Sequence, residues 1–303
     1  MNRKPIVVVG SINIDLVARA ERIPLRGETV LGRDFQMYPG GKGANQAVAA
    51  ARLGYPVRMI ARVGSDAFGE KLRAQLVESG VDVSGVRASP GPSGVAVIAV
   101  ARNGENAIIV TPGANAQVLP KDVDENVIRE AGAVLAQLEI PLRTVRHLGE
   151  LCARLNVPLI LDPAPARALP AGLLKQVSWL TPNETEIGQC LPKAESQDPL
   201  RTVEALVRLV GCGLILKRGS RGVYVAGKDG MRQQIDAFRV KAVDTTAAGD
   251  AFNGAFAVAL MAGKPPVESA RFAVAASAVS VTRPGAQPSM ATREEVERML
   301  AAR

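Results

Sequence analysis

The segment Asp244-Thr-Thr-Ala-Ala-Gly-Asp250 combines a carboxylate with residues that leave the backbone bare. Ala247, Ala248 and Gly249 have no side chain that could cover their N–H groups, and the apolar run after them predicts a buried helix. Unpaired N–H groups at the start of a helix form a site for an anion. Asp250 could act there as a general base while the N–H groups stabilise a phosphoryl group in transfer. An acidic residue that only stabilises the helix dipole explains the segment equally well.

A second glycine-rich segment, Pro39-Gly-Gly-Lys-Gly-Ala-Asn-Gln46, leads into an alanine-rich helical run. It lacks the spacing of a GxxxxGK[ST] phosphate loop. Bare backbone at Gly41, with Lys42 and Asn45 as hydrogen-bonding partners, indicates close approach to a polyhydroxylated ligand. A glycine-rich turn that merely opens a helix is the alternative interpretation.

Asn13 and Asp15 follow the apolar run Ile6–Val9, which is typical of a buried parallel strand. They alternate with Ile12 and Ile14, so both polar side chains are expected to face the same way. Open α/β sheets bind ligands at the carboxyl ends of their strands. Asn and Asp together suit two vicinal hydroxyl groups, whereas an Asx turn that ends the strand is the alternative.

Strand-like and helical runs alternate along most of the chain. This alternation predicts an α/β fold of three layers, α/β/α, around a mostly parallel central sheet. The expected strands are 6–9, 57–63, 134–138, 158–161, 179–181 and 214–217, and the expected helices include 68–79, 142–155 and 200–210.

Two regions, 16–36 and 94–110, are strand-like without an intervening helix. Asn103-Gly104 predicts a hairpin turn in the second of them. We expect these regions to form one small antiparallel sheet. A further hairpin is expected around Lys228-Asp-Gly230.

Composition is that of an ordinary cytoplasmic enzyme. The 303 residues are 47% hydrophobic, enough for one large core or for one core with an appendage, and no apolar stretch approaches the length of a membrane span. Cys152, Cys190 and Cys212 are odd in number and widely spaced, which argues against disulfides and metal ligand pairs.

A formal charge of +8 could suggest a nucleic-acid partner, but basic residues are interleaved with acids and aromatic residues make up only 3% of the chain. Attraction of anionic nucleotides is the simpler consequence. His147 is the only histidine, so chemistry based on histidine or on a histidine-bound metal is not expected.

In order and spacing, these segments resemble the ribokinase/PfkB family of sugar kinases. The resemblance covers nearly the whole chain, and its two glycine-rich signatures lie about two hundred residues apart. It implies one kinase domain over 1–303, with lid strands from about 14–37 and 93–111, and a homodimer formed through the lids. The matching segments are Gly10–Asp15, Pro24–Thr29, Pro39–Gln46, Val63–Asp66, Thr111–Asn115, Gln137–Glu139, Leu161–Pro165, Thr181–Glu186, Asp244–Phe252 and Thr282–Ser289.

The resemblance also implies roles for individual residues. Asp250 would be the catalytic base, with an anion hole at Ala247, Ala248 and Gly249. The sugar would be held by Asn13, Asp15, Gly41, Lys42, Asn45 and Glu139. Phosphate and Mg²⁺ would be organised by Asn183 and Glu186, and the ATP site lined by Lys217, Gly219, Ser220, Arg221 and Gly222. A K⁺ ion would be held by Asp244, Thr246, Ser280, Arg283, Gly285 and Ser289. Val274 departs from the polar residue that relatives often carry near the adenine.

Three functions remain open from the sequence. The first is ATP-dependent phosphorylation of D-ribose at the 5-hydroxyl, and the second is the same reaction on deoxyribose, a nucleoside or another small sugar. Asn13 with Asp15 favours a free sugar that has vicinal hydroxyls. The third is a non-catalytic sugar-binding regulatory protein on the same fold. Asp250 beside an anion hole argues against the third, because a protein that only binds has no need of that pair.

Overall fold

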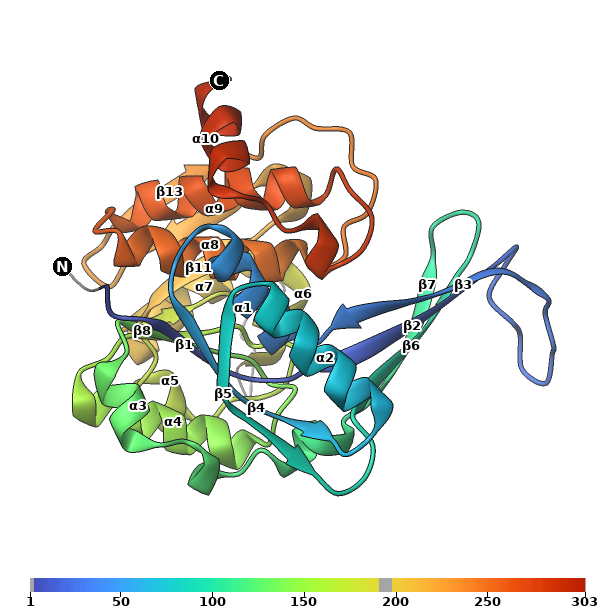
Figure 1. Ribbon diagram of the computed structural model, residues 1–303. Coiled ribbons are helices and arrows are strands. Elements are labelled where there is room, and N and C mark those ends of the chain that lie inside the picture. The colour runs from blue at the N-terminus through green and yellow to red at the C-terminus, as the bar shows by residue number, and fades with distance from the viewer. Residues whose placement is uncertain (1–2, 191–197, 303) are drawn as a thin grey trace.

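The structure, a computed structural model, describes residues 3–190 and 198–302. A nine-stranded sheet in the order β13-β12-β11-β10-β9-β8-β1-β4-β5 forms its centre (Figure 1). The pairs from β11 to β5 are parallel, and β12 and β13 continue the sheet as an antiparallel hairpin. The strands are β1 (Ile6–Val9), β4 (Val57–Gly64), β5 (Val81–Ser89), β8 (Ala133–Ala136), β9 (Leu159–Leu161), β10 (Trp179–Leu180), β11 (Gly213–Lys217), β12 (Val223–Ala226) and β13 (Arg232–Ile235).

Helices cover both faces of this sheet, which explains why β1 is apolar at every position. Ile6 and Val8 belong to one hydrophobic cluster, and Val7 and Val9 belong to the other. The first cluster packs against α1 (Lys42–Arg52), α2 (Ala67–Glu78), α8 (Ala248–Met261), α9 (Pro266–Ser280) and α10 (Arg293–Ala301). The second packs against α3 (Glu125–Glu130), α4 (Leu142–Leu155), α5 (Ala171–Leu174), α6 (Glu184–Cys190) and α7 (Pro199–Val210).

The expected three-layer fold is thus confirmed. The expected helix 142–155 coincides with α4, and the boundaries of 68–79 and 200–210 differ from α2 and α7 by one residue. The hairpin expected at 228–230 joins β12 to β13. Four short 3₁₀ helices complete the described elements: η1 (Gly113–Gln117), η2 (Pro120–Asp122), η3 (Gly219–Arg221) and η4 (Gln287–Ser289).

A second, four-stranded sheet projects from the body of the protein as a lid (Figure 1). Its order is β3-β2-β6-β7, from β2 (Asn13–Ala20), β3 (Gly32–Gly40), β6 (Gly94–Val100) and β7 (Asn106–Thr111). The two outer pairs are antiparallel as expected, but the central pair β2–β6 is parallel. The reason is topological: β2 follows β1 and β6 follows β5, and both of these strands point the same way in the central sheet.

In residues 3–190 and 198–302, none of the helices combines the length and the apolar character that crossing a bilayer requires.

Candidate active site

The polar residues singled out in the sequence meet at the carboxyl ends of the parallel strands. Glu139 follows β8, Asp162 follows β9, and Lys217 is the last residue of β11. Loops from several strands converge at this edge, which is why open α/β sheets bind ligands there. The lid is attached at the same edge, since β2 begins at Asn13 shortly after β1 ends.

Asp250 lies in the first turn of α8 and is 4% exposed. Its carboxylate accepts hydrogen bonds from two amides of α1, Asn45 Nδ2 to Oδ2 and Gln46 Nε2 to Oδ1, each at 3.0 Å. Burial raises the pKa of Asp250, and the nearby Asp162 acts in the same direction, whereas Lys42 and the two amides oppose this. A buried carboxylate with a raised pKa, held by uncharged donors, has the properties of a general base.

The N-terminus of α8 leaves backbone N–H groups free beside this carboxylate. Ala247 is the N-cap residue, and its φ of 59° lies in the left-handed region that residues with a Cβ seldom adopt. Within the described residues, the N–H groups of Gly249 and Asp250 donate to no carbonyl, whereas that of Ala248 donates to Thr245 at 3.3 Å. The turn can therefore offer at least two unpaired donors to an anion.

Lys217 brings a positive charge to the same turn. A Cβ atom at Gly249 would lie 3.1 Å from its Nζ, so glycine leaves room for the ammonium group. Nζ donates to Asp162 Oδ1 at 2.9 Å, and both side chains are largely buried. Asp162 thus holds the ammonium group beside the helix N-terminus, where both attract an anion.

Hydrogen-bonding groups on the other side of Asp250 suit a hydroxylated ligand. Glu139 Oε2 accepts from the Ser11 hydroxyl at 2.5 Å and from the Lys42 backbone N–H at 3.0 Å. Asn13 Oδ1 accepts from Asn115 Nδ2 at 2.7 Å. Because its oxygen is engaged, Asn13 offers its own amide N–H groups as donors.

Asp15 supplies the acceptor next to that donor. The residue is 9% exposed, and its carboxylate accepts no hydrogen bond from any described residue. Burial, followed by the charges of Glu139 and Asp250, raises the pKa of Asp15 to about 7, although Lys42 opposes this. Burial alone would lower the pKa of Lys42, but the surrounding carboxylates, led by Asp250, raise it. Lys42 therefore stays charged and partly balances the acidic cluster.

The glycine-rich turn before α1 approaches the protein's own backbone. A Cβ atom at Gly41 would lie 2.7 Å from the backbone nitrogen of Asn13, and one at Gly43 would lie 2.6 Å from that of Ser11. Gly41 also has a φ of 89°. Bare backbone here allows the first turn of α1 to pack against the segment after β1, which brings the side chains of that turn into the site. Close approach of a ligand to the same backbone stays a prediction.

A cleft of about 650 Å³ opens beside Asp250, a volume that suits a ligand of nucleotide size. Of the residues assigned to an ATP site, Gly219, Ser220 and Gly222 line it together with the lysine of β11. Arg221 does not, because its guanidinium pairs with Glu184 at 2.5 Å. The structure therefore does not bring Arg221 into the cleft.

One end of the cleft is apolar. Val274 is 5% exposed and lines it with Phe238, Val240, Ala278 and Val281. Such a surface can contact the faces of a purine ring, and an apolar contact between Val274 and adenine stays a prediction.

Asn183 and Glu186 line the cleft and also cap α6. Glu186 Oε2 accepts the Asn183 N–H, and Asn183 Oδ1 accepts the Glu186 N–H, each at 2.8 Å. Within the described part of the chain, no cluster of three or more histidine, cysteine or acidic side chains could hold a metal ion. The two capping residues keep lone pairs for water, so they fit a Mg²⁺ ion that retains most of its hydration.

The two segments expected to hold K⁺ meet at Asp244. Its Oδ1 accepts the Thr246 N–H and its Oδ2 accepts the Gly285 N–H, both at 2.9 Å. Burial opposes ionisation, but these bonds lower the pKa of Asp244 below its usual value. Asp244 is therefore an ionised carboxylate that joins the turn before α8 to the loop after α9.

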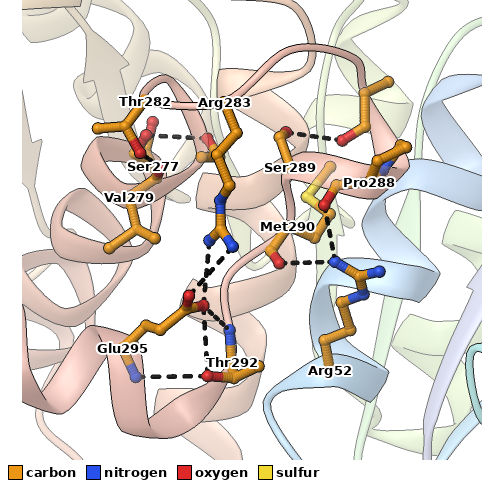
Figure 2. Close-up of polar contacts among 12 residues, drawn as sticks. Arg52, Ser277, Val279, Thr282, Arg283, Pro288, Ser289, Met290, Thr292 and Glu295 are labelled. Atoms are coloured by element: carbon orange, nitrogen blue, oxygen red, sulfur yellow. Dashed lines mark hydrogen bonds and ion pairs between the residues drawn. The ribbon is translucent and has the colours of Figure 1, made fainter. Parts of the chain in front are cut away.

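Figure 2 shows the second of these segments. Arg283 pairs with both carboxylate oxygens of Glu295 at 3.0 Å, so its charge is neutralised within the protein. The hydroxyls of Ser280 and Ser289 each donate to a backbone carbonyl at 2.8 Å. Their oxygens keep lone pairs that could bind a cation.

The sequence-based assignment missed three buried residues of the site: Gln46, Gln137 and Asp162. Gln46 Nε2 donates to both Asp250 and Asp162, and Gln137 donates to Gln46. All three lie inside the segments that carry the resemblance. For Gln137 and Asp162, which directly follow buried strands, that position was the available signal, whereas Gln46 lies within α1 and had none.

Residues 3–293 match the model of the pfkB family of carbohydrate kinases. The ribokinase of Bacillus subtilis is 42% identical over 299 residues, 97% of this chain and 99% of that one. The deoxyribokinase of Salmonella typhi is 35% identical over 97% of this chain and 98% of its own. The structure of Arabidopsis thaliana ribokinase complexed with ribose and ATP has a TM-score of 0.90 at 36% identity and covers 99% of both chains. The expected family is confirmed, and the chain belongs to the pfkB family of carbohydrate kinases.

Proposed function

We propose that this chain is an ATP-dependent kinase that phosphorylates D-ribose at its 5-hydroxyl to give D-ribose 5-phosphate. The observation that carries the proposal is the place of Asp250. This buried carboxylate lies between the hydrogen-bonding groups of Asn13, Asp15 and Glu139 and the bare turn at Gly249. The ribokinases of Bacillus subtilis and Arabidopsis thaliana support ribose and ATP as the substrates.

In this mechanism Asp250 accepts the proton of the 5-hydroxyl as its oxygen forms a bond to the terminal phosphorus of ATP, while the bond from that phosphorus to the bridging oxygen breaks and ADP leaves. Asn45 holds the carboxylate in place through its amide. The N–H groups of Gly249 and Asp250, with Ala247 and Ala248 shaping the turn, stabilise negative charge on the phosphoryl group. Lys217 adds a positive charge at the same turn.

Selection of the sugar follows from paired donors and acceptors. Asn13 donates through its amide, and Asp15 accepts through a carboxylate that has no hydrogen-bond donor among the described residues. A vicinal diol satisfies both, and a sugar that lacks one of these hydroxyls leaves a buried polar group unpaired. Lys42, Asn45 and Glu139 complete the sugar side, with Gly41 in the turn that carries them.

The nucleotide fits the cleft, with the adenine at the apolar end near Val274 and the phosphates near Lys217. Asn183 and Glu186 would hold hydrated Mg²⁺, which supplies positive charge to the phosphates when bound. K⁺ would lie between the two segments that Asp244 joins. The remaining oxygens of that site would come from Thr246, Ser280, Arg283, Gly285 and Ser289, partly through backbone carbonyls.

The lid supports a homodimer. Register places Met37, Leu16, Val97 and Ile109 side by side on one face, the face opposite to Asp15. Met37, Val97 and Ile109 are 44%, 47% and 69% exposed. A row of exposed apolar side chains across four strands needs a cover, and a second lid supplies one of the same shape. One kinase domain over 1–303 and a place in the cytoplasm complete the proposal.

The test is an ATP-dependent phosphorylation panel over ribose, deoxyribose, fructose and adenosine, with and without K⁺. We expect the highest kcat/KM with ribose. Deoxyribose is the second candidate because of the Salmonella typhi relative, and a higher kcat/KM with it would replace ribose in the proposal. Sugar binding without turnover of any acceptor would favour the non-catalytic alternative.

A further inference from the structure

Gln46 joins the two halves of the site through a single side-chain amide. It is completely buried in α1, the helix that follows the glycine-rich turn. Its Nε2 donates to Asp250 Oδ1 at 3.0 Å and to Asp162 Oδ2 at 3.1 Å. Its Oε1 accepts from Gln137 Nε2 at 2.7 Å. Both hydrogens of the amide are therefore in use, and its three partners lie in or next to three different elements, α8, β9 and β8.

The two carboxylates determine which way this amide faces. A glutamine side chain can turn its oxygen and nitrogen about unless a neighbour distinguishes them. Ionised Asp250 and Asp162 accept hydrogen bonds and never donate, so the NH₂ group of Gln46 must face them. The oxygen of Gln46 then faces Gln137, a completely buried amide whose own oxygen has no hydrogen-bond partner among the described residues.

Packing between α1 and α8 leaves Gln46 little freedom to move. A Cβ atom at Gly254 would lie 2.7 Å from the Cβ of Ala49 and 2.8 Å from the backbone oxygen of Gln46. Closely packed helices keep buried side chains in fixed positions. A side chain fixed in this way can orient its partners.

We propose that Gln46 is a positioning residue for phosphoryl transfer, holding the base Asp250 and the Asp162–Lys217 pair in one hydrogen-bonded unit. The Oδ1 of Asp162 binds Lys217 while its Oδ2 binds Gln46, so the unit runs from the base to the ammonium group beside Gly249. Base and ammonium group thereby keep a fixed relative position. The inference rests on the proposed role of Asp250 and adds a residue that contacts neither sugar nor nucleotide in that proposal.

The charged groups around Asp250 stay the same when Gln46 is replaced by a neutral residue, so a change in the pKa of Asp250 can be traced to the lost hydrogen bonds. Lys42 faces Asp250 from α1, Asp162 faces it from the end of β9, and Asp15 faces it from β2. None of these charges is altered when Gln46 is replaced by an uncharged residue. Loss of its N–H groups removes two bonds that favour ionised carboxylates, so protonation of the base becomes easier.

The first test is Gln46→Met, which keeps the length of the side chain and removes both donors. We expect the KM for ribose to change by less than about twofold and kcat at pH 7 to fall about tenfold or more, as for one lost orienting group in an active site. We also expect the acidic limb of the kcat–pH profile to move up by about one pH unit.

Asn253→Met is the matched control. Asn253 is a completely buried amide on α8, and neither polar atom of its side chain has a hydrogen-bond partner among the described residues. This variant should keep the wild-type pH profile even if it alters stability. A Gln46→Met profile that keeps the wild-type acidic limb and falls uniformly, as a purely structural defect would, overturns the proposal.

Two further variants keep the outcome unambiguous. If Gln46→Met does not fold, Gln137→Met removes the hydrogen bond that holds the amide oxygen of Gln46 and should move the acidic limb in the same direction by less; an unmoved limb overturns the proposal. Asp250→Asn is measured beside them. If Asp250→Asn keeps wild-type turnover, Asp250 is not the general base. If Asp250→Asn is inactive but Gln46→Met has the wild-type kcat–pH profile, only the role of Gln46 is refuted.

Discussion

Asp15 should make the stability of the protein fall as pH rises. Its pKa is raised from 3.8 to about 7 in the folded protein, first by burial and then by Glu139 and Asp250. A folded state that binds this proton more tightly than the unfolded chain is favoured at low pH. Relative to high pH, the stabilising effect of the Asp15 proton is fully present below about pH 4. It is lost progressively until the pH passes about 7, the pKa of Asp15 in the folded protein.

The size of the effect follows from the shift of about 3 pH units. At 1.36 kcal/mol per unit, the raised pKa of Asp15 costs about 1.5 kcal/mol of folding free energy at pH 5, where the folded protein must take up a proton, and about 4 kcal/mol at pH 8, where it must hold the ionised carboxylate. Asp15→Asn removes this penalty but leaves a buried amide, which costs about 1–2 kcal/mol at both values of pH. The pH-dependent part is therefore the informative one, a relative gain of about 2.5 kcal/mol between pH 5 and pH 8.

Urea unfolding of wild type and Asp15→Asn at pH 5 and pH 8 measures this gain directly. Asp34→Asn, which alters an exposed lid carboxylate paired with Arg19 at 3.2 Å, is the control and should change stability by less than about 0.5 kcal/mol at either pH. A stability difference for Asp15→Asn that is the same at both values of pH would refute the reasoning. The variant should also bind ribose more weakly, because the acceptor for one hydroxyl is lost.

Three other variants test the remaining assignments. Asp250→Asn should lower kcat about a hundredfold or more while calorimetry still detects sugar binding; more than half of wild-type turnover would refute the base. K⁺ should activate the enzyme more than Na⁺ or Li⁺, and Asp244→Ala should abolish the difference; equal rates with and without K⁺ in the wild type would count against the cation site. Light scattering should give about twice the 31.8 kDa of one chain. Val97→Asp should shift the mass toward the monomer and weaken sugar binding, whereas a monomeric wild type excludes the dimer.

Elements were predictable where one local pattern decides them. Ile6–Val9 is apolar at every position because helices cover both faces of the sheet, and that pattern identified the strand. The turn before α8 was predictable because three small residues precede an apolar helix. The direction of β2 relative to β6 was not, because it depends on which strands of the central sheet precede them, and these lie far apart in the chain.

The partners of polar side chains were the harder part of the site. Arg221 was assigned to the cleft from its position in a glycine-rich loop, but a nearby carboxylate, Glu184, pairs with it instead. Gln46 was not assigned at all, since an amide in an alanine-rich helix does not reveal whether it faces solvent, a ligand or Asp250. Only the packing of α1 on α8 settles that, through contacts about two hundred residues apart in sequence.

The charges of the site residues favour the binding of an additional cation, beyond the ammonium groups of its two lysines. The chain as a whole carries a net charge of +8, yet the site is acidic. Its carboxylates outnumber its ammonium groups and belong to Asp15, Glu139, Asp162, Glu186 and Asp250, against Lys42 and Lys217.

The raised pKa values of Asp15, Glu186 and Asp250 are a consequence of this burial and excess negative charge. A nucleotide triphosphate brings still more negative charge to the cleft beside them. Two ammonium groups cannot balance it, and Asp162 already neutralises one of them, Lys217, at 2.9 Å. We infer that net positive charge enters with the nucleotide, and a hydrated divalent ion near Asn183 and Glu186 would provide it without a cage of protein ligands. The net positive charge of the rest of the chain attracts an anionic nucleotide from solution, and we expect the acidic interior to make turnover depend on such an ion.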